Sequence, residues 1–140
     1  MSRPDISFKK NLPGLICLAI VITLLSLPGS VFPSQNWMGK IYLDKWVHIT
    51  LFFILTVSFC LPLRYAKQKI YIGYFVTYTI LATLISITVG IVMEYIQKCY
   101  IPNRSFELMD IIADSAGSIF GCIFCLRWYK KINPDRHRGS

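Results

Sequence analysis

Long apolar stretches separated by short polar segments organise the sequence. The stretches cover about residues 12–32, 46–64, 70–98 and 106–128. Each has roughly the 20 residues that a helix needs to cross the hydrocarbon core of a bilayer. The pattern therefore predicts an all-α fold, a bundle of four transmembrane helices over residues 12–128.

Polar segments flank this predicted bundle. One covers residues 1–11, and a basic tail covers residues 129–140. The exit of the first stretch, SLPGSVFP, ends or bends the first helix because proline cannot continue it. Asp44 is placed to cap the start of the second helix. The third stretch is rich in Thr, Ile and Tyr, which favour strands in water, but its uncharged length over 70–93 favours a helix.

The composition points to lipid as the solvent. The chain has 140 residues, of which 54% are hydrophobic and only 16% are charged, whereas soluble domains carry about 25% charged residues. The formal net charge is +8. The Lys and Arg residues form short clusters between apolar stretches, without the interleaved aromatic residues of a nucleic-acid patch, so we expect no nucleic-acid partner. Five cysteines, an odd number, predict no disulfide framework.

The positive charges also orient the predicted helices. Of the 15 Lys and Arg residues, all but four lie in the N-terminal segment, in the loop over 64–69 or from Arg127 to the C-terminus. Positive residues favour the cytoplasmic side, so both termini are predicted to lie in the cytoplasm of a multi-pass membrane protein. Most of the acidic residues, together with His48, then lie at the extracytoplasmic end.

The third and fourth stretches meet at a polar turn. Glu94 and Gln97 lie three residues apart before it, and Asp110 and Asp114 lie four apart after it. These spacings place side chains on one helix face. The hairpin is therefore predicted to direct all four side chains into a shared space. Arg104 and Ser105 of the turn are predicted members of the same cluster.

The start of the second helix adds a base to this cluster. Asp44 and His48 are four residues apart and share a helix face, so the carboxylate can orient and charge the imidazole. Lys45 and Arg104 supply compensating positive charge. Ionisable groups at membrane depth are costly and usually functional.

Three interpretations of the cluster remain open. The polar groups can lock the helices in register, or they can bind an anionic or peptide-like envelope molecule, with Arg104 as the donor to a carboxylate or phosphate. They can also perform chemistry, with His48 and the acids holding a metal or acting as acid and base on a lipid-linked substrate. The sequence assigns no catalytic residue, no metal and no cofactor, and binding without catalysis is the preferred interpretation.

Glycines on the predicted helices mark close helix contacts. Gly117 and Gly121 are spaced as in a small-residue packing face, and Gly90 lies on the same stripe as Glu94. The sequence leaves open whether Gly117 and Gly121 pack within one chain or against a second copy in a homo-oligomer.

The ordered combination of these residues resembles the VanZ-like family, named for a teicoplanin-resistance protein of Gram-positive bacteria. The similarity spans about residues 26–121. Its motifs are Asp44-Lys45-x-x-His48-x-x-x-Phe52, Gly90-x-x-x-Glu94-x-x-Gln97, Arg104-Ser105 and Asp110-x-x-x-Asp114-x-x-Gly117. The chain departs from the family at Asp114, where the family usually has Asn, and this adds a negative charge to the cluster.

The resemblance implies an integral protein of the bacterial cytoplasmic membrane that is linked to the cell envelope. For some family members it implies reduced action of teicoplanin-type antibiotics. The expected partners are membrane lipids and a cell-wall precursor or peptide-like envelope ligand. The runner-up is a membrane enzyme, using a metal or acid–base groups, that acts on a lipid-linked envelope substrate.

Overall fold

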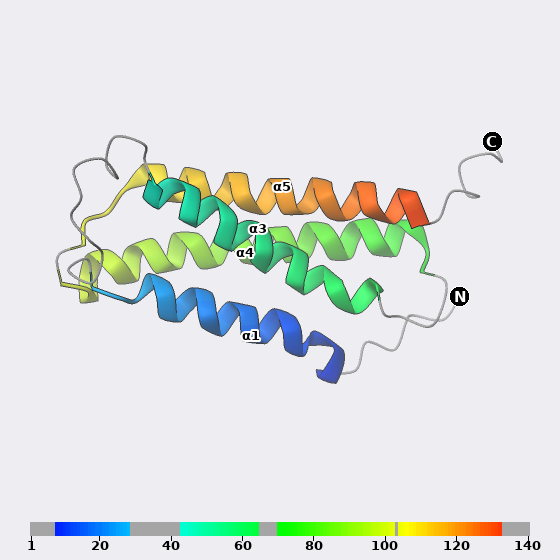
Figure 1. Cartoon of the computed structure of the whole chain (residues 1–140), viewed down its shortest axis with the longest axis horizontal. Helices are drawn as coiled ribbons and strands as arrows, with labels where there is room; N and C mark the ends of the chain where they lie inside the picture. The colour runs from blue at the N-terminus through cyan, green and yellow to red at the C-terminus, as the bar shows by residue number, and fades with distance from the viewer. Residues whose placement is uncertain (1–7, 29–42, 65–69, 103, 133–140) are drawn as a thin grey trace.

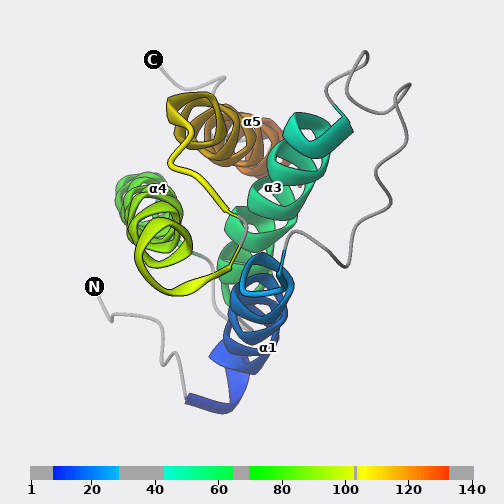
Figure 2. The ribbon, with the colours of Figure 1, turned by 90° about the vertical axis from the view of Figure 1, so that its left-hand side faces the viewer.

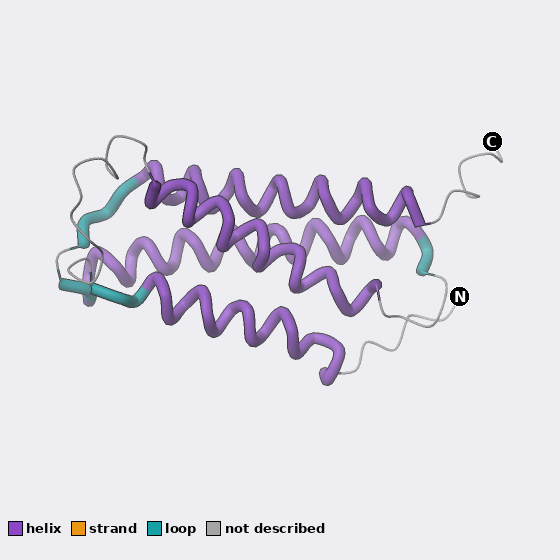
Figure 3. Tube along the Cα trace, in the orientation of Figure 1, coloured by secondary structure: helices purple, strands orange, loops and turns teal. Residues whose placement is uncertain are grey.

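The described residues of the computed structural model are 8–28, 43–64, 70–102 and 104–132. Within these ranges the regular structure is entirely helical (Figure 3). The helices are α1 (Phe8–Leu25), α3 (Leu43–Arg64), α4 (Ile72–Tyr100) and α5 (Leu108–Ile132). The predicted all-α class is therefore confirmed.

The four helices run lengthwise beside one another and alternate in direction (Figure 1). One end of the bundle collects the end of α1, the start of α3, the end of α4 and the start of α5. Seen from that end, α3 lies between α1 and α5, and α4 packs against α5 and α3 (Figure 2). The arrangement brings the starts of α3 and α5 together, although α4 separates them in sequence.

The observed helix bounds differ from the predicted ones mainly at α1. This helix begins at Phe8, inside the predicted polar segment, and ends at Leu25, whereas the prediction extended it to residue 32. Residues 26–28 form a turn instead, and residues 29–32 lie outside the described part. At the other end, α5 continues to Ile132, into the predicted tail.

Asp44 does not cap α3 as predicted. The helix already begins at Leu43, so Asp44 lies inside its first turn. A carboxylate at that position still interacts favourably with the positive end of the helix dipole. The contribution of Asp44 is thus electrostatic, and its side chain is directed to Lys45, as described below.

Two glycines let α5 approach α3 closely. A Cβ atom added at Gly117 would collide with the backbone carbonyl of Ile49, and one at Gly121 would lie 2.9 Å from Cβ of Thr56 and 3.0 Å from the carbonyl oxygen of Phe53. The small-residue face therefore packs within one chain, against α3. The sequence left open whether these glycines pack within one chain or against a second copy, and the structure shows packing within one chain.

Apolar packing fills the end of the bundle opposite the polar cluster. Phe75 of α4 stacks on Tyr129 of α5 with ring centroids 4.3 Å apart, and the Tyr129 hydroxyl donates to the carbonyl of Ile70 at 2.7 Å. A second apolar cluster joins α1, α3 and α4 around Phe52. The buried acidic side chains of the described residues, Glu94, Asp110 and Asp114, lie at the other end.

The outward faces of the helices are apolar along their length. Large exposed side chains include Leu81 and Leu84 on α4 and Phe120 and Phe124 on α5, and such extended apolar surfaces suit contact with lipid. Three helices, α3, α4 and α5, are long and apolar enough to cross a membrane, whereas the apolar part of α1, Asn11–Leu25, is shorter. These features suggest a membrane protein.

Candidate functional site

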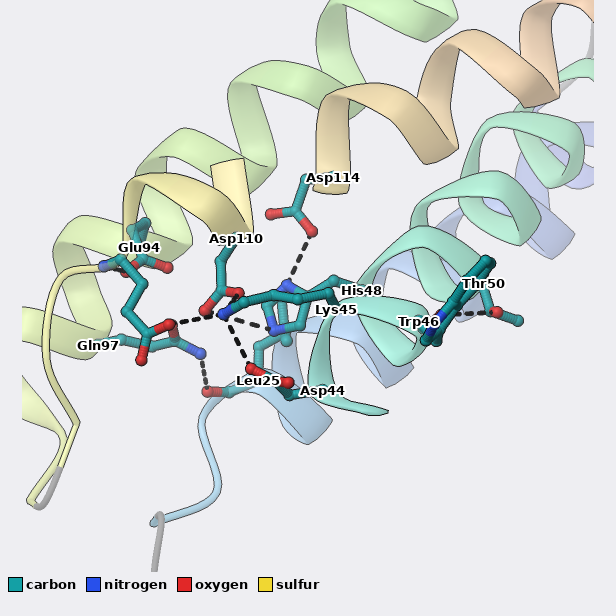
Figure 4. A network of polar contacts seen from close by, with 11 residues as sticks. Leu25, Asp44, Lys45, Trp46, His48, Thr50, Glu94, Gln97, Asp110 and Asp114 are labelled. Atoms are coloured by element: carbon teal, nitrogen blue, oxygen red, sulfur yellow. Dashed lines mark hydrogen bonds and ion pairs between the residues drawn. The ribbon is translucent and has the colours of Figure 1, made fainter. Parts of the chain in front are cut away.

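The candidate site lies where the starts of α3 and α5 meet the last turns of α4 (Figure 4). His48 comes from α3, Glu94 and Gln97 from α4, and Asp110 and Asp114 from α5; all five side chains are buried. The structure thus brings together residues that are far apart in sequence. We call this group, with Lys45, the polar cluster.

Lys45 is held by carboxylates from two helices and the segment before α5. Its ammonium group lies 2.8 Å from Asp44 and 2.6 Å from Glu107, and it also contacts Asp110. A lysine ammonium has three N–H donors, so each carboxylate can accept one. Because Lys45 is mostly buried and Asp110 is buried, this ion pair ties the start of α3 to the start of α5.

His48 lies between two aspartates of α5. Its Nδ1 is 2.8 Å from Oδ1 of Asp114, while Nε2 is 4.0 Å from Oδ2 of Asp110. With Asp114 ionised, its carboxylate can only accept, and in that state Nδ1 carries the proton and donates to it. The longer distance on the Nε2 side exceeds a hydrogen bond. Nδ1 is therefore held by Asp114, whereas Nε2 faces Asp110 without a hydrogen bond to it.

Glu94 fastens the segment that connects α4 to α5. Its Oε1 accepts a hydrogen bond of 2.5 Å from the backbone N–H of Glu107. The side chain of Glu107 meanwhile binds Lys45, and its carbonyl accepts from the N–H of Asp110 at 2.9 Å. Glu107 is thus held through both its backbone and its side chain, beside the polar cluster.

Gln97 has a different role from the one predicted. Its Nε2 donates to the carbonyl oxygen of Leu25 at 2.9 Å (Figure 4). Leu25 is the last residue of α1, and the last carbonyls of a helix have no partner within it. Gln97 therefore caps the end of α1 and fastens this helix to α4.

We expect Gln97→Leu to lower the free energy of unfolding by about 1–3 kcal/mol, because the Leu25 carbonyl would stay buried without a donor. The measurement is SDS unfolding of the purified protein in mixed micelles. Val92→Leu, on the exposed face of the same helix, is the matched control and should be near neutral. Equal stability of the two variants would contradict the capping role.

Two of the predicted members of the site are placed differently. Asp44 and His48, expected to pair, do not: Asp44 binds Lys45, whereas His48 binds Asp114. Asp44 is exposed at the start of α3, where Lys45 binds it, whereas His48 is buried against Asp114 of α5. Of the turn residues, Arg104 is half-buried and Ser105 is exposed.

Sequence reasoning missed Glu107 as a member of the site. The backbone N–H of Glu107 donates to Glu94, and the side chain of Glu107 accepts from Lys45. The available signal was its position immediately before a helix that begins at Leu108, where acidic side chains are favoured.

Gly90 makes room for the buried acid of α5. A Cβ atom at Gly90 would lie 2.7 Å from Oδ2 and 2.9 Å from Cβ of Asp114. Any side chain at position 90 would thus push Asp114 away from His48. Gly90 therefore acts on the polar cluster itself, in addition to packing α4 against α5.

A set of three carboxylates in the site has metal-like spacing. Ligand oxygens of Asp44, Glu107 and Asp110 lie within 4.8 Å of one another. The ammonium of Lys45, however, binds all three. A metal ion at this position would have to displace that ammonium, so the arrangement is better described as a lysine-centred ion-pair network.

Comparison with known proteins finds no matching family model, and no curated protein or solved structure is found to be similar to the chain. The resemblance to the VanZ-like family therefore rests on the residue pattern alone.

Proposed function

We propose that the chain is a VanZ-like protein of the bacterial cytoplasmic membrane that binds or modulates a cell-envelope component at its polar cluster. The observation that carries the proposal is the buried His48–Asp114 pair, beside Asp110 and Glu94, within helices of membrane length. Burying such groups in a membrane protein is costly, and they usually mark a binding or transport site.

The proposal includes four membrane crossings with both termini inside. Three crossings are supported by helix length. For the fourth, the apolar part of α1, Asn11–Leu25, is shorter; its length is about 22 Å against the roughly 30 Å of a bilayer core, so its assignment as a crossing rests on its packing. Its antiparallel course beside α3 (Figure 1) supports the same assignment. The distribution of Lys and Arg then directs the polar cluster outward.

The cluster carries both signs of charge, which favours a peptide-like ligand over a purely anionic one. Asp110 and Glu94 offer carboxylate oxygens, whereas Arg104 of the segment before α5 offers a cationic donor. The Lys45 ammonium is already shared among three carboxylates. A peptide with free amino and carboxyl groups matches both sets. Among envelope components, a lipid-linked cell-wall precursor combines such a peptide with a membrane anchor.

We expect the purified protein in nanodiscs to bind a lipid-linked disaccharide–pentapeptide precursor, measured by native mass spectrometry. His48→Ala and Arg104→Ala should each weaken binding at least tenfold. Ile119→Ala, on the exposed face of α5, should leave it unchanged. Expression of the wild type, but not of His48→Ala, should also raise the minimum inhibitory concentration of teicoplanin in a susceptible Gram-positive host.

Absence of precursor binding, or equal binding by His48→Ala, would refute the proposed ligand. Thermal unfolding of each variant accompanies the binding measurement. Because His48→Ala also leaves a buried carboxylate without its partner, Arg104→Ala is the deciding variant. Loss of stability and binding in the same proportion by Arg104→Ala would indicate that the cluster only holds the helices in register.

One observation favours an enzyme as the second candidate. Asp114 fixes the proton on Nδ1 of His48, and Nε2 faces Asp110. An imidazole oriented in this way can act as a general base through its second nitrogen. In the same mass-spectrometric experiment an enzyme would convert the precursor to a product of different mass, and His48→Ala or Glu94→Gln would abolish that conversion.

A further inference from the structure

Many serine and threonine hydroxyls in the described helices are satisfied locally. Six of them, including those of Thr79, Thr83 and Ser86, donate to the backbone carbonyl four residues earlier at 2.8–2.9 Å. The hydroxyls of Thr56 and Ser118 are different. Both are fully buried, and neither has a hydrogen-bond partner in the described part of the chain.

These two hydroxyls come from neighbouring positions on two packed helices. Thr56 of α3 lies against Gly121 of α5, and the Thr56 atoms nearest to that glycine are Cβ and the methyl carbon Cγ2. Ser118 lies three residues before Gly121, which is less than one helical turn, or about 5 Å, along the axis. The two unpartnered groups are therefore close to the same level of the bundle.

A third polar residue faces the same level from α4. Gly90 lies opposite Asp114, and α4 runs antiparallel to α5. One turn further into the bundle, Ser86 is therefore opposite Ser118. The Ser86 hydroxyl is buried and donates to the carbonyl of Ala82 at 2.9 Å, which leaves its oxygen lone pairs to accept a hydrogen bond.

We propose that Thr56, Ser118 and Ser86 form a binding site for internal water between α3, α4 and α5. A buried water typically makes about three hydrogen bonds to groups that are otherwise unsatisfied. The chemistry selects water over a cation. A cation would engage only the oxygen lone pairs, whereas the Thr56 and Ser118 protons need an acceptor, and water can both donate and accept.

The site extends the polar cluster toward the middle of the bundle. Ser118 lies four residues after Asp114, on the same face of α5 and one turn deeper. Thr56 is about 20 Å along α3 from its first residue. Water at this level places an exchangeable proton donor and acceptor beneath the His48–Asp114 pair. This inference does not depend on the identity of the envelope ligand.

A double-mutant cycle tests the site in the full-length protein. Thr56→Val and Ser118→Ala each remove a hydroxyl with little change of shape. With water bound, each single variant leaves the water short of a partner, and the melting temperature should fall by about 3–6 °C. The double variant, which no longer needs the water, should melt at or above the temperature of either single variant.

The opposite result would overturn the proposal. If the two hydroxyls are simply unsatisfied, removing either one makes the protein more stable. If each bonds to its own helix, removing it leaves the stability unchanged. In both cases the effects of the two substitutions are additive. Radiolytic hydroxyl-radical footprinting gives a second measurement. Oxidation of the buried Phe52 and Cys60, one turn to either side of Thr56, should be present in the wild type and fall several-fold in the double variant. Equal oxidation, or none in the wild type, would count against bound water.

Discussion

Gly117→Leu is expected to abolish the folded bundle or to lower its free energy of unfolding by about 3 kcal/mol or more. Even a single methyl group at this position would collide with the backbone carbonyl of Ile49. Backbone atoms cannot move aside as the end of a flexible side chain can, so α3 and α5 would have to separate. This separation would also pull His48 away from Asp114.

The measurement is SDS unfolding in mixed micelles, with Gly117→Ala as an intermediate step. Gly73→Ala is the matched control, because its Cβ would meet only the exposed side chain of Tyr71, which can rotate away. We expect the order of stability to be Gly73→Ala, then Gly117→Ala, then Gly117→Leu. A Gly117→Leu protein as stable as the control would show that the two helices are not in close contact.

His48→Ala is expected to cost about 3–5 kcal/mol, because it leaves the buried carboxylate of Asp114 without its partner. Asp114→Asn should cost much less, since the amide oxygen of asparagine can still accept the proton of Nδ1. Combining the two replacements should recover much of the loss from His48→Ala, because a neutral side chain at position 114 needs no compensating charge.

Thr50→Ala, on the exposed side of the same helix, provides the control for His48→Ala. The readout is again the free energy of unfolding, combined as a double-mutant cycle. Strictly additive effects of His48→Ala and Asp114→Asn would mean that the two side chains do not interact in the folded protein.

The helices of the described residues and most of the residues of the polar cluster could be predicted from the sequence. The length of the apolar stretches predicted the helices. The spacing of four residues placed Asp110 and Asp114 on one helix face. Partner choice could not be predicted, because it depends on how the helices rotate and pack. His48 is only four residues from Asp44 and 66 from Asp114, yet it binds Asp114, since the glycines of α5 bring that helix against α3.

Hydrogen bonds between side chains and backbone groups could not be predicted either. Gln97 binds the carbonyl of Leu25, and Glu94 binds the N–H of Glu107. Every residue has such groups, so residue types alone give no hint of which will be used. Glu94 and Gln97 were correctly marked as unusual for an apolar helix, but only the three-dimensional structure shows that Gln97 serves the end of α1.

The separation of His48 and Asp114 by 66 positions has a consequence for biosynthesis. At roughly 5–20 residues per second, about 3–13 s pass between the emergence of the imidazole from the ribosome and that of its carboxylate. Throughout this interval α3 carries His48 without its carboxylate partner. Assembly of the site is therefore a late event, completed only when the final helix docks.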